Sequence, residues 1–530
     1  MADRSEPQSE KLIARAVWML ILAAIVVATS WSLGLNSRQV LSVSVFAFIV
    51  LGTLFFWSFR LALAFLGLAA LLICGVLDIP KFVKSSSLEV VLFLVGMMVV
   101  VGALRDLGFF TWIIQLIISL PGLTGRRFVL ITAVTSALLA CVVDEVTSIL
   151  IMAVLVFQVC DTLKINPTPY LMISVMATNI GSSGTMLGNP VGIFIGTKAG
   201  LTFEDFMVWA FPIMLVCLVA AIAVVMVYYH REIVRFEEKL RERRERELGL
   251  GPRVKVAYGR GIAVLVGTIG LVAIHHRLEQ LLALPVNTVL LMAPLISAGL
   301  IMIWRRDRAR HYVENEVDWW TLLFFLLLFS VVGTLEYTQV TDRMAEGFAA
   351  HVSRNATILT PVIVGITAVG SAFVDNVVFV AAFVPIVKSL AASGLHAMPL
   401  WWALLFGACY GGNITMIGST ANIVALGMLE KRYHGHIRFL DWLKVGLLVG
   451  VITCAVSAGC LMLLSRWMPR TSVEHTAHVP SFQEPEFTLP LSIENSTLVV
   501  NIRHPVLLYD IDEPIISNVT PDMALSDVFE

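Results

Sequence analysis

Apolar segments long enough to cross a membrane recur along most of the chain. Each approaches the roughly 20 residues that a helix needs to cross a hydrocarbon core of about 30 Å. The segments 126–160 and 355–392 are also apolar but carry a polar interruption, which predicts re-entrant hairpins that enter and leave the membrane on one side. The pattern predicts an all-α polytopic membrane protein with about 11 transmembrane helices. These crossings are expected at 16–33, 40–57, 61–77, 88–104, 169–198, 206–229, 260–276, 285–304, 318–335, 400–428 and 440–467.

The composition agrees with a membrane protein and excludes several other classes. The 530 residues are 58% hydrophobic and 14% charged, whereas soluble globular domains are about 25% charged. The lipid bilayer is therefore an expected partner, and the net charge of −1 gives no reason to expect nucleic acid. The seven cysteines lie in apolar segments without metal-ligand spacing, so no cofactor is expected apart from a coupling ion.

Basic segments indicate which side of the membrane faces the cytoplasm. Residues 230–260 contain ten Lys or Arg and six Glu, and the sequence RRDRAR follows at 305–310. Because basic loops stay inside, a crossing count from a cytoplasmic N-terminus places both segments in the cytoplasm. The 230–259 linker is expected to form a solvated helix there. The same count places the polar C-terminal tail outside the plasma (inner) membrane, and its runs STLVVNI and VLLYDID are typical of short strands.

The chain contains an internal repeat. VVDEVT at 142–147 aligns with FVDNVV at 373–378 at an offset of 231 residues, and this offset also aligns 88–104 with 319–335. The crossing count runs these two aligned helices in opposite directions, so the halves are expected to be inverted-topology repeats. The expected divisions are 1–39 for the N-terminal tail and first helix, 40–229 for the first repeat, 230–259 for the linker, 260–467 for the second repeat and 468–530 for the tail.

Two polar, glycine-rich stretches interrupt apolar helices at repeat-related positions. They are TNIGSSGTMLGNP at 178–190 and GGNITMIGSTAN at 411–422. A helix can break at membrane depth only where protein or a water-filled cavity receives its backbone groups. Unwound carbonyls with Asn, Ser and Thr oxygens suit a small cation, and half-helix N-termini attract anions. We therefore expect a binding site in each broken helix; the alternative is a packing surface of small residues whose hydroxyls bond to neighbouring turns.

Three carboxylates lie within apolar sequence near these breaks. A charge at the bilayer centre costs on the order of 2.5–3.5 kcal/mol, so Asp144, Glu145 and Asp375 each need a cavity, a partner or a bound proton. Such carboxylates can bind Na⁺ or carry a proton, and a Na⁺ site is expected near Asp144, Asp375 and Asn413. The alternative is that they cap short helices at the hairpin tips without exchanging ions. The two roles are compatible.

The motifs VVDEVTSILIM, TNIGSSGTMLGNP, FVDNVVFVAAF and GGNITMIGSTANI resemble the repeated signatures of the ion transporter superfamily. The branch that they resemble contains arsenite permeases, P proteins and sodium/proton antiporters, with a citrate-transporter-like membrane domain. The resemblance covers roughly 40–467. It implies two inverted repeats, each with a re-entrant hairpin and a broken helix, a homodimer, a small ionic solute at the hairpin tips, and an elevator-like movement.

The resemblance also implies site residues, position by position. Two departures concern them: Asp144 is followed by Glu145 where the family often has Asn, and Asn189 stands where it often has Asp. The first half thus gains one carboxylate and loses another. The predicted substrate- and ion-binding residues are Asp144, Glu145, Thr147, Asn179, Ser182, Ser183, Thr185, Asn189, Asp375, Asn376, Asn413, Thr415, Ser419, Thr420 and Asn422.

The predicted function is a secondary active transporter that moves a small inorganic or carboxylate anion, coupled to Na⁺ or H⁺, and not an enzyme. A Na⁺/H⁺ antiporter and an arsenite efflux permease are the alternatives within this class. An intramembrane serine protease is a distant alternative, since Gly181–Gly184 reads GSSG but no histidine lies mid-helix to act as its base. A channel would need a continuous pore. Transport driven by ATP is not expected, because the sequence contains no phosphate-binding loop of the type GxxxxGK[ST].

Overall fold

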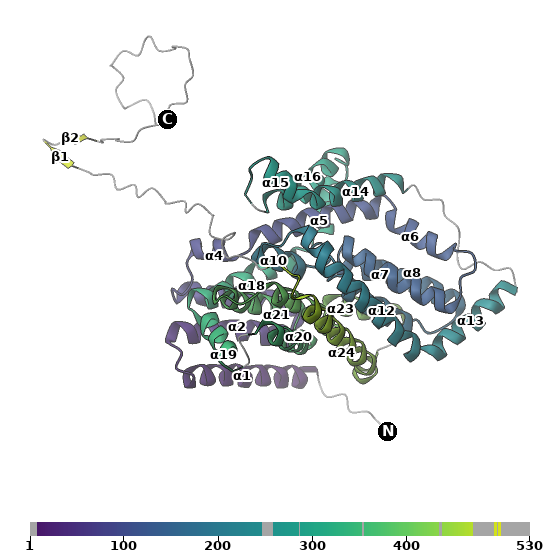
Figure 1. Ribbon diagram of the computed structural model, residues 1–530, viewed down its shortest axis with the longest axis horizontal. Coiled ribbons are helices and arrows are strands. Elements are labelled where there is room, and N and C mark those ends of the chain that lie inside the picture. The colour runs from purple at the N-terminus through teal and green to yellow at the C-terminus, as the bar shows by residue number, and fades with distance from the viewer. Residues whose placement is uncertain are drawn as a thin grey trace, which may run out of the picture. The chain divides into compact units, whose positions relative to one another are not determined.

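The computed structural model describes residues 8–245, 258–285, 287–351, 355–433, 437–469, 492–494 and 497–499. The chain divides into two units, Met1–His475 and Thr476–Glu530. In the described part of the first unit, the regular elements are helices (Figure 1).

The helices of the first unit fall into two successive series. The first series is α1 (Gln8–Ser32), α2 (Ser37–Phe55), the 3-10 turn η1 (Trp57–Phe59), α3 (Arg60–Ile73), α4 (Ile79–Ser85), α5 (Leu88–Asp106), α6 (Phe109–Ile118), α7 (Gly125–Val142), α8 (Glu145–Leu163), α9 (Thr168–Gly181), α10 (Pro190–Ala199), α11 (Phe203–Asp205), the π-helical turn η2 (Phe206–Ala210), α12 (Phe211–Tyr228) and α13 (His230–Glu245).

The second series begins after the linker. It is α14 (Gly259–Ala273), α15 (His275–Leu281), α16 (Thr288–Trp304), α17 (Ala309–His311), the π-helical turn η3 (Tyr312–Glu316), α18 (Trp319–Tyr337), α19 (Val340–His351), α20 (Ala356–Phe373), α21 (Asn376–Ala392), α22 (Met398–Gly411), α23 (Thr420–Tyr433) and α24 (Phe439–Leu464).

Nine helices in the described residues are long and apolar enough to cross a membrane, or ten if the bent pair α14 and α15 forms one span. The predicted all-helical, polytopic membrane class is confirmed. The arms α7, α8 and α20 of the hairpins are among the nine. The total of about 11 crossings, the re-entrant course of the hairpins and the inverted orientation of the repeats stay predictions.

The two series follow the same order of elements. In the first, α5 and α6 precede the hairpin α7–α8, the broken helix α9–α10 and the long helix α12. In the second, α18 and α19 precede the hairpin α20–α21, the broken helix α22–α23 and the long helix α24. α9 packs on α7 and α12, as α22 packs on α20 and α24, and the long helices α12 and α24 lie side by side (Figure 1).

Close glycine contacts follow this correspondence. The backbone of Ala137 in α7 lies against Gly181, so near that a Cβ built on Gly181 would be 2.2 Å from the Ala137 carbonyl oxygen. In the second series, a Cβ built on Gly411 would be 2.4 Å from the Ala368 carbonyl oxygen of α20. Only glycine permits this approach. Each broken helix is thereby held directly on the first arm of its own hairpin.

The charged segment after α12 is partly helical, as the sequence predicted, but it is not fully solvated. Helix α13 buries Ile233, Phe236 and Leu240. The Phe236 ring stacks on Phe128 of α7 with 4.8 Å between the ring centroids, and the Tyr170 hydroxyl of α9 donates a hydrogen bond to the Glu232 carbonyl. The helix therefore packs against the first hairpin and the first broken helix.

Several short elements were not predicted from the sequence. α4, α6, α15 and α19 lie in stretches assigned to loops or to the ends of longer helices. At 7 to 12 residues they are too short to show a spanning pattern, and only their packing against neighbouring helices reveals them.

In the second unit, the described residues form a two-stranded antiparallel ladder of β1 (Ser492–Glu494) and β2 (Thr497–Val499), in which Ile493 pairs with Leu498. β2 falls within the predicted strand run STLVVNI. The other predicted run, VLLYDID, lies outside the described residues.

The glycine contacts generate a prediction about stability. Gly181→Ala and Gly411→Ala should each lower the melting temperature of the purified protein in detergent, because overpacking against backbone typically costs about 1–3 kcal/mol. Gly270→Ala is the matched control, since a Cβ at Gly270 in α14 meets no atom within 4 Å. Melting curves from intrinsic fluorescence would measure the three shifts. Equal melting temperatures for all three variants would contradict the close packing.

Candidate ion-binding site

The tip of each hairpin is an aspartate that begins the second arm. Asp144 caps α8: its Oδ1 accepts a hydrogen bond from the Thr147 amide at 2.8 Å and its Oδ2 accepts one from the Thr147 hydroxyl at 2.7 Å. Asp375 caps α21 by accepting from the Val377 amide at 3.0 Å. Short polar side chains before a helix favour this arrangement. The capping role considered from the sequence is therefore present at both tips.

The first tip has an unusual backbone. Asp144 has a φ of 149°, a region that residues other than glycine rarely adopt. Such a conformation costs on the order of 1–3 kcal/mol and is concentrated at functional sites. The neighbouring packing holds it in place, since Val143 and Glu145 on either side are buried.

The two broken helices are each bonded to their own hairpin. The first break spans 182–189, and the Thr185 hydroxyl donates a hydrogen bond to the Cys141 carbonyl at the end of α7. The second break spans 412–419, and the Thr415 hydroxyl donates to the Ala372 carbonyl at the end of α20. Asp375 also accepts a hydrogen bond from the Thr420 hydroxyl at 2.9 Å, which ties the second tip to α23.

The end of α9, just before the first break, meets the second break at Asn179. Its Nδ2 donates hydrogen bonds to Asn413 Oδ1 at 2.9 Å and to Asn422 Oδ1 at 2.8 Å, and its Oδ1 accepts one from the Ser419 hydroxyl at 2.9 Å. Asn422 in turn donates to the carbonyls of Gly412 and Thr415. Asn179, Asn413, Ser419 and Asn422 are all buried. We call these four residues the amide cluster.

A second group of polar contacts joins the first break to α22. Asn189 Nδ2 lies 2.9 Å from Ser182 Oγ, 3.1 Å from Cys409 Sγ and 3.5 Å from Glu145 Oε2. The hydroxyl oxygens of Ser183 and Tyr410 are 3.1 Å apart. Residues from the first tip, the first break and α22 of the second series are thus in contact.

The three carboxylates form an electrostatically strained set. The Glu145 carboxylate is repelled by those of Asp375 and Asp144, and the side chains of Asn189 and Ser182 offer it hydrogen bonds. Glu145 and Asp375 are buried, whereas Asp144 is partly exposed. Like charges at low dielectric are costly, so the set favours a bound cation or protons.

The structure brings most of the predicted residues together. They fall into four bonded groups: the amide cluster with Thr415, Asn189 with Ser182 and Glu145, Ser183 with Tyr410, and Asp375 with Thr420. Asn376 is buried, and its Oδ1 has no hydrogen-bond partner in the described structure. Thr147 contacts Asp144 and neither break. Among the described residues, no group of three or more His, Cys, Asp or Glu could hold a metal ion. The predicted Na⁺ site stays a prediction.

Residues from three helices at the site were not predicted from the sequence. Cys409 and Tyr410 precede the second break and contact the first, but both read as apolar helix. The Trp442 indole of α24 donates to the Asn413 carbonyl at 3.1 Å. Arg60 is buried at the start of α3 and interacts electrostatically with Asp375. The only sequence signal for Arg60 was a single charge within a long apolar stretch.

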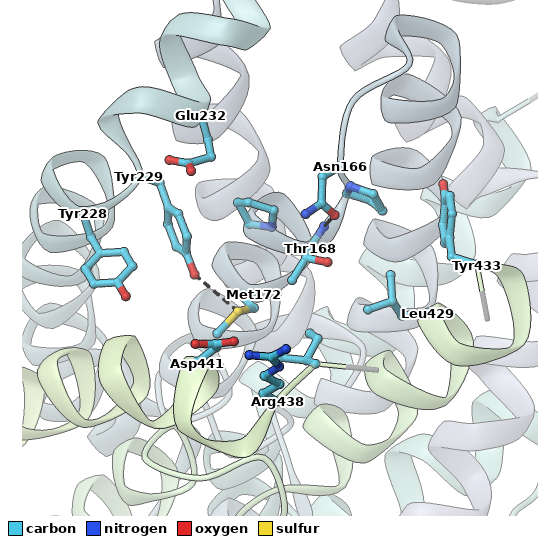
Figure 2. Close-up of a pocket in the computed structure, with 13 residues that line it drawn as sticks. Asn166, Thr168, Met172, Tyr228, Tyr229, Glu232, Leu429, Tyr433, Arg438 and Asp441 are labelled. Carbon is cyan, nitrogen blue, oxygen red and sulfur yellow. Dashed lines mark hydrogen bonds between the residues drawn. The ribbon is translucent and has the colours of Figure 1, made fainter. Parts of the chain in front are cut away.

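An open cavity of about 560 Å³ lies at the start of α9 (Figure 2). The ends of α12, α23 and α24 also line it. Figure 2 shows the Tyr229 hydroxyl directed at the Met172 sulfur, at 3.3 Å, with Asp441 and Arg438 nearby. The cavity contains none of the predicted site residues; Met172 precedes Asn179 by about two helical turns, or about 10 Å. The amide cluster itself is closed to solvent.

Comparisons with known proteins identify the family of the chain. A sequence profile of the citrate transporter family CitMHS matches residues 46–407. An uncharacterized transporter of Mycobacterium tuberculosis is 33% identical over 379 residues, which are 71% of this chain and 86% of that protein. The human P protein is 26% identical over 475 residues, covering 75% of this chain and 56% of that protein.

A solved structure, that of the YdaH transporter of Alcanivorax borkumensis, is also similar to the chain. It has a TM-score of 0.47 and 15% sequence identity, and the match covers 73% of this chain and 87% of that one. The family profile covers more than half of the chain, so the resemblance inferred from the repeated motifs is confirmed. The chain therefore belongs to the citrate transporter family and is a multi-pass membrane transporter.

Proposed function

We propose that the protein is a secondary active transporter that moves a small anion across the plasma membrane, coupled to Na⁺ or H⁺. The observation that carries the proposal is the meeting of the two broken helices at the buried amide cluster, with Glu145 and Asp375 bonded to the neighbouring residues Asn189 and Thr420. Backbone amides and hydroxyl groups of the two breaks supply donors for an anion, and the carboxylates supply oxygens for the coupling cation.

The resemblance to the superfamily supports further parts of the proposal. The protein is a homodimer, as that resemblance implies. The positions of the basic loops support a cytoplasmic N-terminus and charged linker and an external C-terminal tail. Cargo and coupling ion bind near the hairpin tips.

Cation exchange is a second candidate because of one specific observation. Glu145 and Asp375 come from the two hairpin tips, and their carboxylates repel each other within a buried site. A pair of this kind can exchange a metal cation for protons without any anionic cargo. Proteoliposomes with imposed Na⁺ and pH gradients would separate the candidates. Gradient-driven uptake of succinate, citrate, sulfate or arsenite supports the anion transporter, whereas Na⁺/H⁺ exchange alone supports the antiporter.

Replacement of Asp375 tests the role of the carboxylate. Asp375→Asn should reduce cation-driven uptake at least about tenfold, because the amide removes the charge that binds the cation. Asparagine is also a good helix cap, so its Oδ1 retains the hydrogen bond from Val377 and the fold should persist. Asp307→Asn is the control, since Asp307 is exposed in the basic loop. Undiminished coupled uptake by Asp375→Asn would refute the proposed role.

Replacement of Asn179 tests the connection between the halves. Asn179→Ala leaves the buried side chains of Asn413 and Asn422 without a donor, at a cost of about 1–3 kcal/mol each. We expect a lower melting temperature together with loss of uptake. Asn315→Ala is the control because Asn315 is exposed and its amide contacts only its own helical turn. Wild-type uptake and stability in Asn179→Ala would show that the amide cluster is dispensable.

A further inference from the structure

A buried arginine with free donor groups lies beside the site. Arg60, the first residue of α3, is 3% exposed. Its Nη2 donates a hydrogen bond to the Thr321 hydroxyl of α18 at 2.8 Å, whereas Nε and Nη1 have no partner in the described structure. A buried charge that is left without hydrogen bonds costs several kcal/mol. The unpaired atoms therefore call for an explanation beyond packing.

The surroundings of Arg60 hold its guanidinium in one orientation. The guanidinium carbon lies 4.1 Å from the centroid of the Trp57 ring and 5.0 Å from that of the Phe324 ring. Aromatic faces attract a cation and restrict its position. The group is thus fixed between η1, α3 and α18, with its remaining N–H groups available to a ligand.

The neighbouring carboxylates do not use these donors. Arg60 attracts Asp375 and Asp318 electrostatically, but neither forms an ion pair with it in the described structure. Asp318 instead accepts hydrogen bonds from the amide and hydroxyl of Thr321. Both oxygens of Asp375 accept hydrogen bonds from Val377 and Thr420. The carboxylates are thus engaged at the starts of α18, α21 and α23, and the guanidinium Nε and Nη1 stay without a partner.

We propose that Arg60 binds the anionic cargo, as the residue that recognises a carboxylate or a small inorganic oxyanion between α3, α18 and the second hairpin tip. A guanidinium presents a planar set of N–H donors that matches such groups, and the charge strengthens each hydrogen bond. The inference rests on the proposed transport of an anion and names the residue that would hold it. Neither break, 182–189 or 412–419, contains an arginine, and Arg60 supplies one from outside them.

The position of Arg60 also connects cargo to coupling ion. An anion held by Arg60 is repelled by the nearby Asp375 carboxylate as long as that carboxylate is unneutralised. A cation bound at Asp375 removes the repulsion, so anion and cation favour each other's binding. Reciprocal enhancement of this kind is what coupled transport requires.

The test compares Arg60→Gln and Arg60→Lys with wild type in proteoliposomes. The probes are succinate and citrate as carboxylates and sulfate as an inorganic oxyanion, each with inward Na⁺ and pH gradients. Arg60→Gln should raise the KM for the transported probe at least about tenfold, the effect of losing charge-assisted hydrogen bonds. Arg60→Lys keeps the charge but loses the planar donor set, so its KM should lie between those of wild type and Arg60→Gln. A raised KM for succinate or citrate indicates that Arg60 binds a carboxylate, and a raised KM for sulfate indicates that it binds an inorganic oxyanion.

Arg38→Gln is the matched control. Arg38 lies on the adjacent helix α2 and is exposed. Its replacement by Gln removes the same charge without changing the buried site. Its KM should equal that of wild type. Unchanged KM in Arg60→Gln, in a wild-type protein that does transport a probe, overturns the inference and leaves the proposed function intact.

A binding measurement separates failure of the inference from failure of the proposed function. If wild-type protein transports none of the probes, the proposed anion transport fails. Thermal shifts of the purified proteins with succinate, citrate or sulfate then decide about Arg60. Stabilisation of wild type but not of a folded Arg60→Gln or Arg60→Lys variant supports the anion site. Equal stabilisation, or none in wild type, overturns it.

Discussion

The structure depends on satisfying polar groups inside an apolar surrounding. Each break removes several residues from the helical hydrogen-bond ladder at a depth where water is scarce, and each unpaired group there costs several kcal/mol. The chain meets this constraint with its own side chains. Thr185 and Thr415 bond to hairpin carbonyls, and Asn422 donates to the carbonyls of Gly412 and Thr415. The residues that make the breaks tolerable are therefore the same residues that a ligand would contact.

This double use explains why binding and structural interpretations of the same motif are compatible. Asp375 caps α21 through one oxygen and accepts from Thr420 through the other. Asn189 begins α10 by accepting from Gly192, and its amide group turns toward Ser182 and Glu145. In each side chain, one polar atom accepts a hydrogen bond from a backbone amide and the other polar atom faces side chains of the site. The local charge there is negative, so the proposed cation and the guanidinium of Arg60 offset it.

The sequence predicted what depends on local pattern and missed what depends on distant packing. Apolar runs, the repeated Asp144 and Asp375 motifs and the glycine-rich breaks were recognisable, because each combines helix-breaking residues with polar side chains inside apolar sequence. Tyr410 and Arg60 were not recognised. Their contacts join residues 227 and 261 positions apart, namely Ser183 with Tyr410 and Arg60 with Thr321. No periodicity carries that information, since it arises only when the two series of helices pack together.

The pattern of contacts also favours one kind of movement in the proposed transport cycle. Gly181 and Gly411 fix the broken helices on their own hairpins, and the amide cluster fixes the two breaks on each other. The two hairpins and the two broken helices thereby form one packed unit that is joined by polar contacts.

The contacts of this unit with α5 and α18 are mainly apolar or partly exposed, unlike the buried hydrogen bonds within the unit. The Phe194 ring of α10 stacks on Phe329 of α18 with 4.3 Å between centroids, and apolar contacts of this kind have no fixed register of hydrogen bonds. The ion pairs that cross the boundary, Lys198 with Glu89 and Lys388 with Glu336, are partly exposed. Exposed pairs contribute little stability. Sliding of the unit along α5 and α18 would thus break weaker interactions than separation of the amide cluster, as the elevator-like movement expected from the superfamily resemblance would require.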